Sequence, residues 1–130
     1  LRAEGVRTCI GGLSPASRQA AARCADGWTG WGISLSDFAR FAAEIPDTVE
    51  ATWAGQVLVG DTPAEAAAKL ERHGDRPGLV HGTVDDLAAH LRALAAASAT
   101  WAICAPIDIG TDPEAVGRIA KAAELATPGR

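Results

Sequence analysis

A four-residue pattern of glycine, any residue, a capping residue and proline occurs three times in the chain, at 12–15, 60–63 and 110–113. Each copy follows a short apolar run and precedes an alanine-rich stretch. Glycine permits a sharp turn, the capping residue begins a helix, and proline fits the first helical position. The chain therefore repeats a switch from strand to helix, which predicts a parallel sheet with helices packed outside it.

The residues around these junctions predict individual elements. We expect strands over 6–10, 56–59 and 101–105 or slightly beyond, the first of them buried, and a helix from Pro15 through residue 25. Capping boxes are expected for Thr62 with Glu65 and for Thr111 with Glu114, and Gly82-Thr83 with Asp86 is expected to begin another helix. Apolar stripes at helical spacing are predicted core: Phe38, Phe41, Ala42 and Ile45; Leu87, Leu91 and Leu94; Val116, Ile119 and Ala123.

Composition excludes several classes of protein. The 130 residues are 48% hydrophobic, enough for one domain with a core. A net charge of -4 and scattered basic residues argue against nucleic-acid binding and against a membrane-surface patch. No apolar run approaches the roughly 20 residues that span a bilayer. Three cysteines without a CxxC pair, and histidines without HxxxH spacing, predict no disulfide and no metal site, with reduced, mostly buried thiols in a cytoplasmic protein.

The first junction has the residues of a phosphate-binding turn. Gly11 and Gly12 would let the backbone approach a ligand closely, and the N–H groups of Leu13 and Ser14 would face it at the start of a helix. Trp28 is kept as a candidate because the strand containing it follows that helix and is expected to end near the same place. The same pattern is also an ordinary exit from a strand, so the residues alone leave both interpretations open.

An ordered set of motifs resembles the C-terminal part of the luciferase-like monooxygenase superfamily, in the branch that uses coenzyme F-420. The motifs cover nearly the whole chain: Ile10-Gly11-Gly12-Leu13-Ser14-Pro15-Ala16, Asp26-Gly27-Trp28, Val57-Leu58-Val59-Gly60-Asp61-Thr62-Pro63-Ala64-Glu65-Ala66, His81-Gly82-Thr83-Val84-Asp85-Asp86-Leu87 and Ala99-Thr100-Trp101-Ala102-Ile103. Ser98 departs from the family, which often has glycine there, and we expect this residue to need the left-handed conformation.

The resemblance implies an α/β fold in which 1–130 form the C-terminal half of a (β/α)8 barrel, with the N-terminal half absent from this chain. It implies an oxidoreductase that transfers a hydride between F-420 and an organic substrate, with Gly11, Gly12, Leu13 and Ser14 holding the coenzyme phosphate. Catalytic groups would come from the absent strands, so none is assigned here. An FMN-dependent monooxygenase and a non-catalytic α/β binding module are the alternatives. The expected partner is a small-molecule substrate, and a homodimer stays open.

Overall fold

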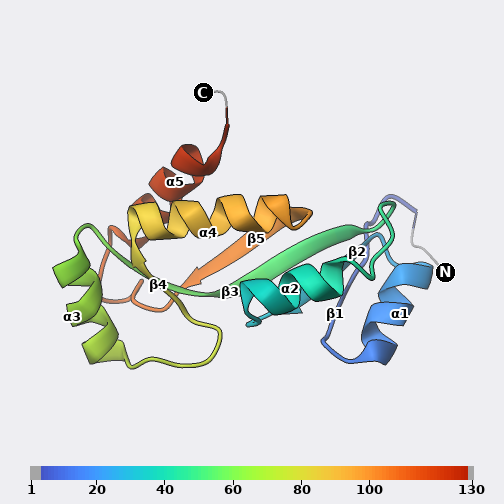
Figure 1. The fold of residues 1–130 in the computed structure, drawn as a ribbon, viewed down its shortest axis with the longest axis horizontal. Helices are drawn as coiled ribbons and strands as arrows, with labels where there is room; N and C mark the ends of the chain where they lie inside the picture. The colour runs from blue at the N-terminus through green and yellow to red at the C-terminus, as the bar shows by residue number, and fades with distance from the viewer. Residues whose placement is uncertain (1–3, 129–130) are drawn as a thin grey trace. The chain divides into compact units, whose positions relative to one another are not determined.

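The structure of the protein, a computed structural model, describes residues 4–128. Its elements in chain order are β1 (Cys9–Gly11), α1 (Pro15–Cys24), β2 (Gly27–Trp31), α2 (Leu35–Ala42), β3 (Glu50–Gly60), α3 (Pro63–His73), β4 (Val80–Thr83), α4 (Val84–Ala96), β5 (Ala99–Pro106) and α5 (Ala115–Ala126) (Figure 1). Strands and helices alternate as predicted. The described residues divide into two compact units, one of residues 4–54 and 94–103 and the other of residues 55–93 and 104–128.

The first unit is built on a parallel sheet in the order β1-β2-β3. Ile10 lies opposite Trp28, which in turn lies opposite Ala51 of β3. The buried face of this sheet carries Trp28 and Trp53, both fully buried, and the Trp28 ring stacks on Phe38 of α2 with centroids 5.8 Å apart. Because these strands are parallel, their carboxyl ends lie along one edge of the sheet.

The second unit contains the end of β3, which pairs in parallel with β4 from Val57 opposite Val80 to Gly60 opposite Thr83. Val57, Leu58 and Val59 are buried. β5 also pairs with β3. Apolar residues thus occupy consecutive positions of β3 here, as expected for a parallel strand covered on both faces.

Local helix signals are confirmed at three junctions. Ser14 accepts a hydrogen bond from the backbone of Ser17 at the start of α1, and Thr62 accepts one from Glu65 at the start of α3. Thr83 and Asp86 cap each other reciprocally at the start of α4. Ser98 has a φ of 72° and is the one non-glycine residue with positive φ in the range 4–128, as predicted.

Two strand predictions are wrong at their ends. β1 begins at Cys9 rather than at residue 6 and is not buried, because its partner β2 begins at Gly27, opposite Cys9. Before that point Thr8 bonds Asp26 instead, donating its N–H to the carboxylate at 2.8 Å. β3 begins at Glu50 rather than at residue 56, since β2 offers a partner along its whole first half.

The predicted capping box at the last junction is also wrong, because α5 begins only at Ala115. The Thr111 hydroxyl donates to the carbonyl of Asp108 at 3.2 Å instead of capping a helix. The stripe predicted on α5 is wrong as well: Ala115 and Ala122 are buried, whereas Val116 is exposed. The segment before α5 is held by long-range contacts that local spacing does not reveal.

Candidate functional site

The turn at the carboxyl end of β1 brings four of the predicted site residues together. Gly11 is the last residue of the strand, and Gly12 has a φ of 142°, which an L side chain rarely adopts. A Cβ on Gly12 would also come within 2.6 Å of the Ser17 hydroxyl oxygen. At Gly11 the nearest atom to such a Cβ, the Thr29 carbonyl oxygen, lies 3.8 Å away. Gly12 is therefore required by the fold, whereas Gly11 is not.

The backbone donors of this turn divide into committed and open groups. The Gly12 N–H donates to the Thr29 carbonyl at 3.3 Å, so it closes the sheet and does not face a ligand. The N–H groups of Leu13 and Ser14 donate to no acceptor in the described part of the chain. Two adjacent donors at the start of a helix are an arrangement that attracts an anion.

The second junction closes one of the equivalent donors, and the third closes both. At the second, the Asp61 N–H donates to the Glu65 carboxylate at 2.9 Å. At the third, the N–H groups of Thr111 and Asp112 both donate to the Asp108 carbonyl, at 2.9 and 2.8 Å. The shared sequence pattern therefore has different outcomes, and only the first of these three junctions keeps both donors open.

Trp28 meets the turn from the interior. Its side chain is fully buried, and its indole N–H donates to the Gly12 carbonyl at 2.8 Å. Trp28 therefore lies beside the turn. Its ring has no exposed surface with which to contact a ligand, and its contact is with the backbone of the turn.

Arg18 also holds the turn, and sequence reasoning missed it. The residue is 9% exposed, and its Nη1 donates to the Leu13 carbonyl. Its Nε donates to the Glu44 carboxylate at 2.7 Å, and its guanidinium lies 4.0 Å from the centre of the Phe41 ring. The residues next to Arg18 in the sequence do not indicate this role, because its partners are distant: Phe41 lies on α2 and Glu44 lies just after it.

A second polar cluster lies in the second unit, centred on Lys69. Its ammonium donates to the Val59 carbonyl at 2.9 Å and to the carboxylates of Asp108, at 2.7 Å, and Asp112. Burial alone lowers the pKa of Lys69, but the bonds to the two carboxylates outweigh it and raise that pKa. The bond from Lys69, followed by one from the Glu114 N–H, holds the pKa of Asp112 down at about 2.

This cluster continues to Arg118, which donates to the carboxylates of both Asp112 and Asp61. The bond from Arg118 lowers the pKa of Asp61, and the carboxylates in turn raise the pKa of the guanidinium. Each charge in the cluster has a partner of opposite sign. We therefore interpret it as a structural link between α3, α5 and the segment between β5 and α5.

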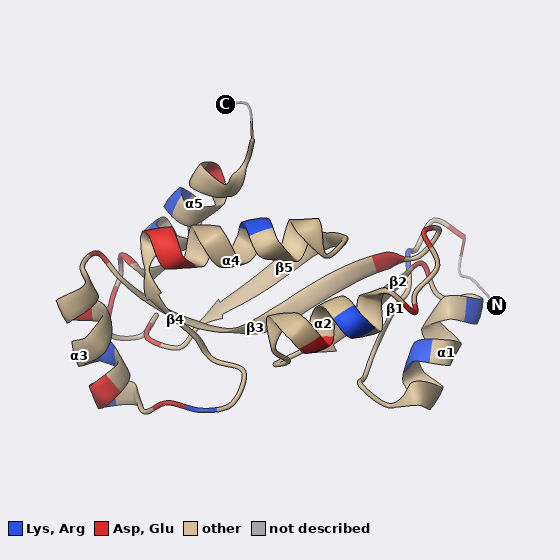
Figure 2. Cartoon of the chain, in the orientation of Figure 1, with Lys and Arg blue, Asp and Glu red and all other residues tan. Residues whose placement is uncertain are grey.

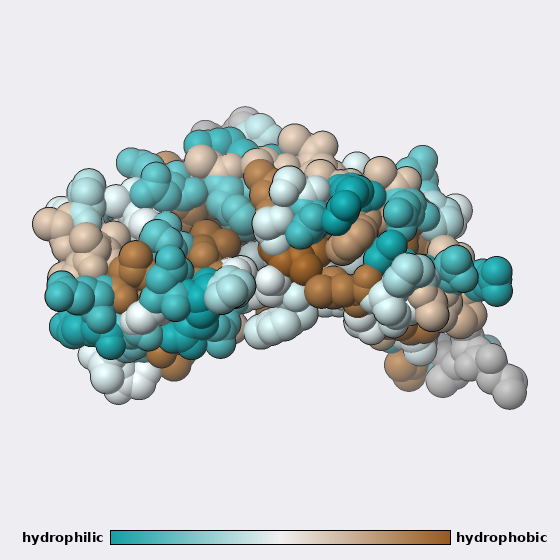
Figure 3. Space-filling view, turned by 60° about the horizontal axis from the view of Figure 1, so that its bottom comes forward, coloured by the Kyte–Doolittle hydropathy of each residue, from teal (hydrophilic) through white to brown (hydrophobic). Residues whose placement is uncertain are grey.

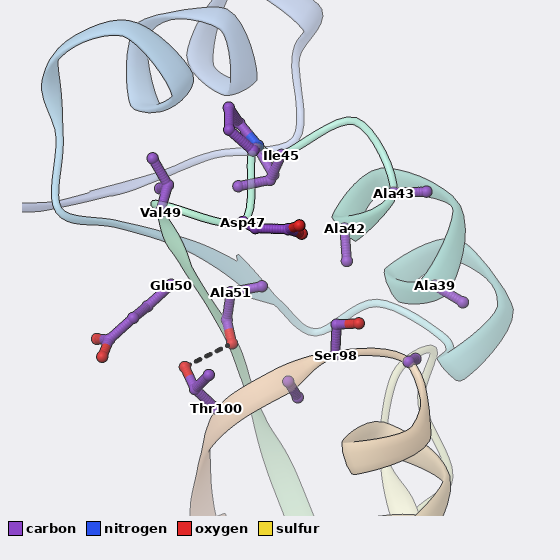
Figure 4. Close-up of a pocket in the computed structure, with 13 residues that line it drawn as sticks. Ala39, Ala42, Ala43, Ile45, Asp47, Val49, Glu50, Ala51, Ser98 and Thr100 are labelled. Carbon is purple, nitrogen blue, oxygen red and sulfur yellow. Dashed lines mark hydrogen bonds between the residues drawn. The ribbon is translucent and has the colours of Figure 1, made fainter.

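A hollow of about 540 Å³ lies at the amino-terminal end of β3 in the first unit (Figure 4). It is lined by the end of α2, the segment that follows it, the start of β3 and residues 97–100. Thr100 donates there to the Ala51 carbonyl at 3.4 Å. Barrel enzymes place their chemistry at the carboxyl ends of the strands, whereas this hollow lies at the amino end of β3.

Charged and hydrophobic side chains are mixed on the parts of the surface that the figures show. Lys and Arg are spread over all five helices (Figure 2), and hydrophobic side chains lie among hydrophilic ones on the face in Figure 3. Residues 4–128 hold no cluster of three metal-ligating side chains and no helix that is long and apolar enough to cross a membrane. All three cysteines are free, but Cys9 and Cys24 are exposed, so the prediction of mostly buried thiols is wrong.

Comparison with known proteins gives the fold. No family model and no curated protein sequence matches the chain. The crystal structure of apo-MsnO8 is similar with a TM-score of 0.69 and 18% identity, over 98% of this chain and 54% of that one. A coenzyme F420 dependent tetrahydromethanopterin reductase from Methanopyrus kandleri is similar with a TM-score of 0.65 and 15% identity, over 92% and 48%.

The chain has the fold of part of a (β/α)8 barrel. It spans about half the length of these two structures. At 18% and 15% identity the likeness concerns the fold alone.

Proposed function

We propose that this chain is part of a luciferase-like oxidoreductase that transfers a hydride between coenzyme F-420 and a small organic substrate. In this proposal the turn from Gly11 to Ser14 holds the coenzyme phosphate. The observation that carries it is the pair of open N–H groups on Leu13 and Ser14, beside a capped helix at the carboxyl end of a parallel strand. The similar fold of an F420-dependent reductase supports the choice of coenzyme.

Hydrogen bonds from the backbone would supply most of the binding energy at this turn. A helix dipole contributes only about 0.3 to 1 kcal/mol to an exposed anion, whereas a hydrogen bond to a charged group contributes about 1.5 to 3 kcal/mol. Two such bonds, from Leu13 and Ser14, would therefore outweigh the dipole. The role of Gly11 in this scheme is to leave space beside the donors.

The chain's own residues bind and orient in this proposal, and they do not carry out the chemistry. When bound, the coenzyme supplies the hydride chemistry. We assign no catalytic residue among the 130, because the turn contributes only donors.

FMN is the alternative coenzyme, because it carries a phosphate that the same turn would hold. Binding of F-420 and FMN measured side by side, followed by anaerobic reduction or oxidation of the bound coenzyme, separates the two. Tighter F-420 binding and hydride transfer without oxygen are expected. Tighter FMN binding with oxygen consumption would assign the chain to a flavin monooxygenase, and binding of neither would favour the non-catalytic module.

The turn itself is tested with Gly11→Val in the polypeptide that carries this sequence. A Cβ at Gly11 would make only an ordinary contact, with the Thr29 carbonyl oxygen at 3.8 Å, so the branched side chain should block the ligand without disturbing the fold. We expect coenzyme binding to weaken by at least about tenfold, the loss of one charged hydrogen bond. Gly110→Val is the matched control, since a Cβ there meets nothing within 4 Å and the fold should tolerate this change as well. Unchanged affinity in Gly11→Val would remove the phosphate assignment.

A further inference from the structure

We propose that Trp28 and Arg18 are positioning residues that aim the N–H groups of Leu13 and Ser14 at a bound phosphate. The inference deepens the proposed function and rests on it. Neither side chain would touch the phosphate in this scheme. Each acts through a carbonyl of the turn, and together they decide which way two consecutive peptide planes face.

The geometry follows from the planarity of the peptide bond. Residues 4–128 contain no cis peptide bond, and in a trans peptide the C=O and the following N–H point in opposite directions. The Gly12 carbonyl is bonded to the buried indole of Trp28, so the Leu13 N–H of the same peptide faces away from the interior. The next carbonyl, that of Leu13, is bonded to Arg18, so the Ser14 N–H faces away from Arg18.

Both side chains are themselves held in place from α2 and the residues after it. The Trp28 ring stacks on Phe38 and meets Phe41 edge-on, with centroids 6.5 Å apart. Arg18 is fixed between the Phe41 ring and the Glu44 carboxylate. Groups locked by packing and by a second set of hydrogen bonds hold a binding geometry more tightly than mobile ones.

The positive charge of Arg18 does not account for its role at the turn. Its guanidinium is paired with Glu44 at 2.7 Å, and the side chain is 10% exposed. The paired carboxylate offsets the positive charge at the turn. Arg18 therefore acts on a phosphate by orienting the Leu13–Ser14 peptide, and not as its counter-ion.

The experiment measures the preference for phosphate and not affinity alone. The dissociation constants give two affinity ratios for each protein. One is the affinity for FMN divided by that for riboflavin, and the other is the affinity for F-420 divided by that for its phosphate-free deazariboflavin. We expect Arg18→Met and Trp28→Phe to lower both ratios by about tenfold, the value of one misdirected hydrogen bond to a charged group. Affinity for the phosphate-free ligands should stay within about twofold, because the rest of the site is untouched.

Two controls match these changes in chemistry. Arg40→Met removes a second arginine, which lies over the Phe41 ring at 4.9 Å and pairs with an aspartate, but makes no hydrogen bond to the turn among the described residues. Trp53→Phe removes another buried indole N–H, which donates to the Ile33 carbonyl at 3.1 Å. Both controls should keep the phosphate preference of the parent protein.

Glu44→Gln keeps the test decisive if a buried variant fails to fold, since the Glu44 side chain is 53% exposed. Loss of the pairing should loosen Arg18 and lower the phosphate ratios. A rise in the ratios would show that Arg18 is a counter-ion and overturn the inference. Unchanged ratios in Arg18→Met and Trp28→Phe would also overturn it. A parent protein with no preference for the phosphorylated ligands would instead refute the proposed function.

Discussion

Replacement of Lys69 by methionine should destabilise the protein more than any surface substitution. The Lys69 side chain is 4% exposed and that of Asp108 is 2% exposed, so the pair is shielded from solvent. Methionine fills a similar volume but leaves the Asp108 carboxylate buried without its cation. Breaking a buried pair in this way costs about 3 to 5 kcal/mol.

The arrangement of the cluster explains why the cost is high. Asp112 keeps Arg118 as a partner after the change, but Arg118 makes no ion pair with Asp108 in the described structure. The full desolvation cost therefore falls on Asp108. A domain is stable by only about 5 to 15 kcal/mol, so the substitution would remove a large share of that free energy.

Urea unfolding followed by far-UV circular dichroism measures this change in the free energy of unfolding. Lys121→Met, on the exposed surface of α5, is the control and should stay within about 0.5 kcal/mol of the parent. In an Asp108→Asn background the same Lys69 substitution should cost at least about 1 kcal/mol less, because no buried charge is orphaned. A loss below about 1 kcal/mol in the wild-type background would refute the burial argument.

Three further results are expected. Gly12→Ala should cost about 1 to 3 kcal/mol of stability because of its positive φ, whereas Gly11→Ala should leave the melting temperature unchanged in a thermal scan. The bond from Lys69, the largest cause, holds the pKa of Asp112 at about 2, below its usual 3.8. This carboxylate therefore stabilises the fold above about pH 4, and that stability is lost as the pH falls towards 2. The stability of Asp112→Asn should decline less steeply on acid titration than that of the parent, and an identical curve would contradict the linkage. Sedimentation of the 130-residue chain should show self-association, since Trp31 and Trp101 are exposed, and a stable monomer would instead indicate a self-contained domain.

Features that depend on neighbours in sequence could be predicted without the structure. The caps at Ser14, Thr62 and Thr83 each join a side chain to a backbone group three residues on. The left-handed backbone of Ser98 follows from the end of α4 and the start of β5 on either side of it. Such contacts are set by local geometry, which the residue types report directly.

Features that depend on distant partners could not. Lys69 and Asp108 are separated by 39 positions, and Arg18 and Glu44 by 26. From the sequence alone, Lys69 and Arg18 would each be interpreted as a solvated charge on a helix. The failed capping box before α5 has the same origin, because Thr111 bonds the Asp108 carbonyl and Asp108 is itself held by Lys69.

The contrast between the first two junctions gives a last prediction, that Ser17→Glu closes the phosphate turn. Ser17 stands three residues after its cap, as Glu65 does after Thr62, and Glu65 reaches back to the N–H before that cap at 2.9 Å. A glutamate at 17 should bond the Leu13 N–H in the same way and repel a phosphate, which lowers the F-420 affinity by at least about tenfold. The melting temperature should hold or rise, because a capping box is completed. Glu65→Ser, the reverse change, should leave coenzyme binding unaltered. If Ser17→Glu binds F-420 as tightly as the parent, the open donors of the first junction are not where the phosphate lies.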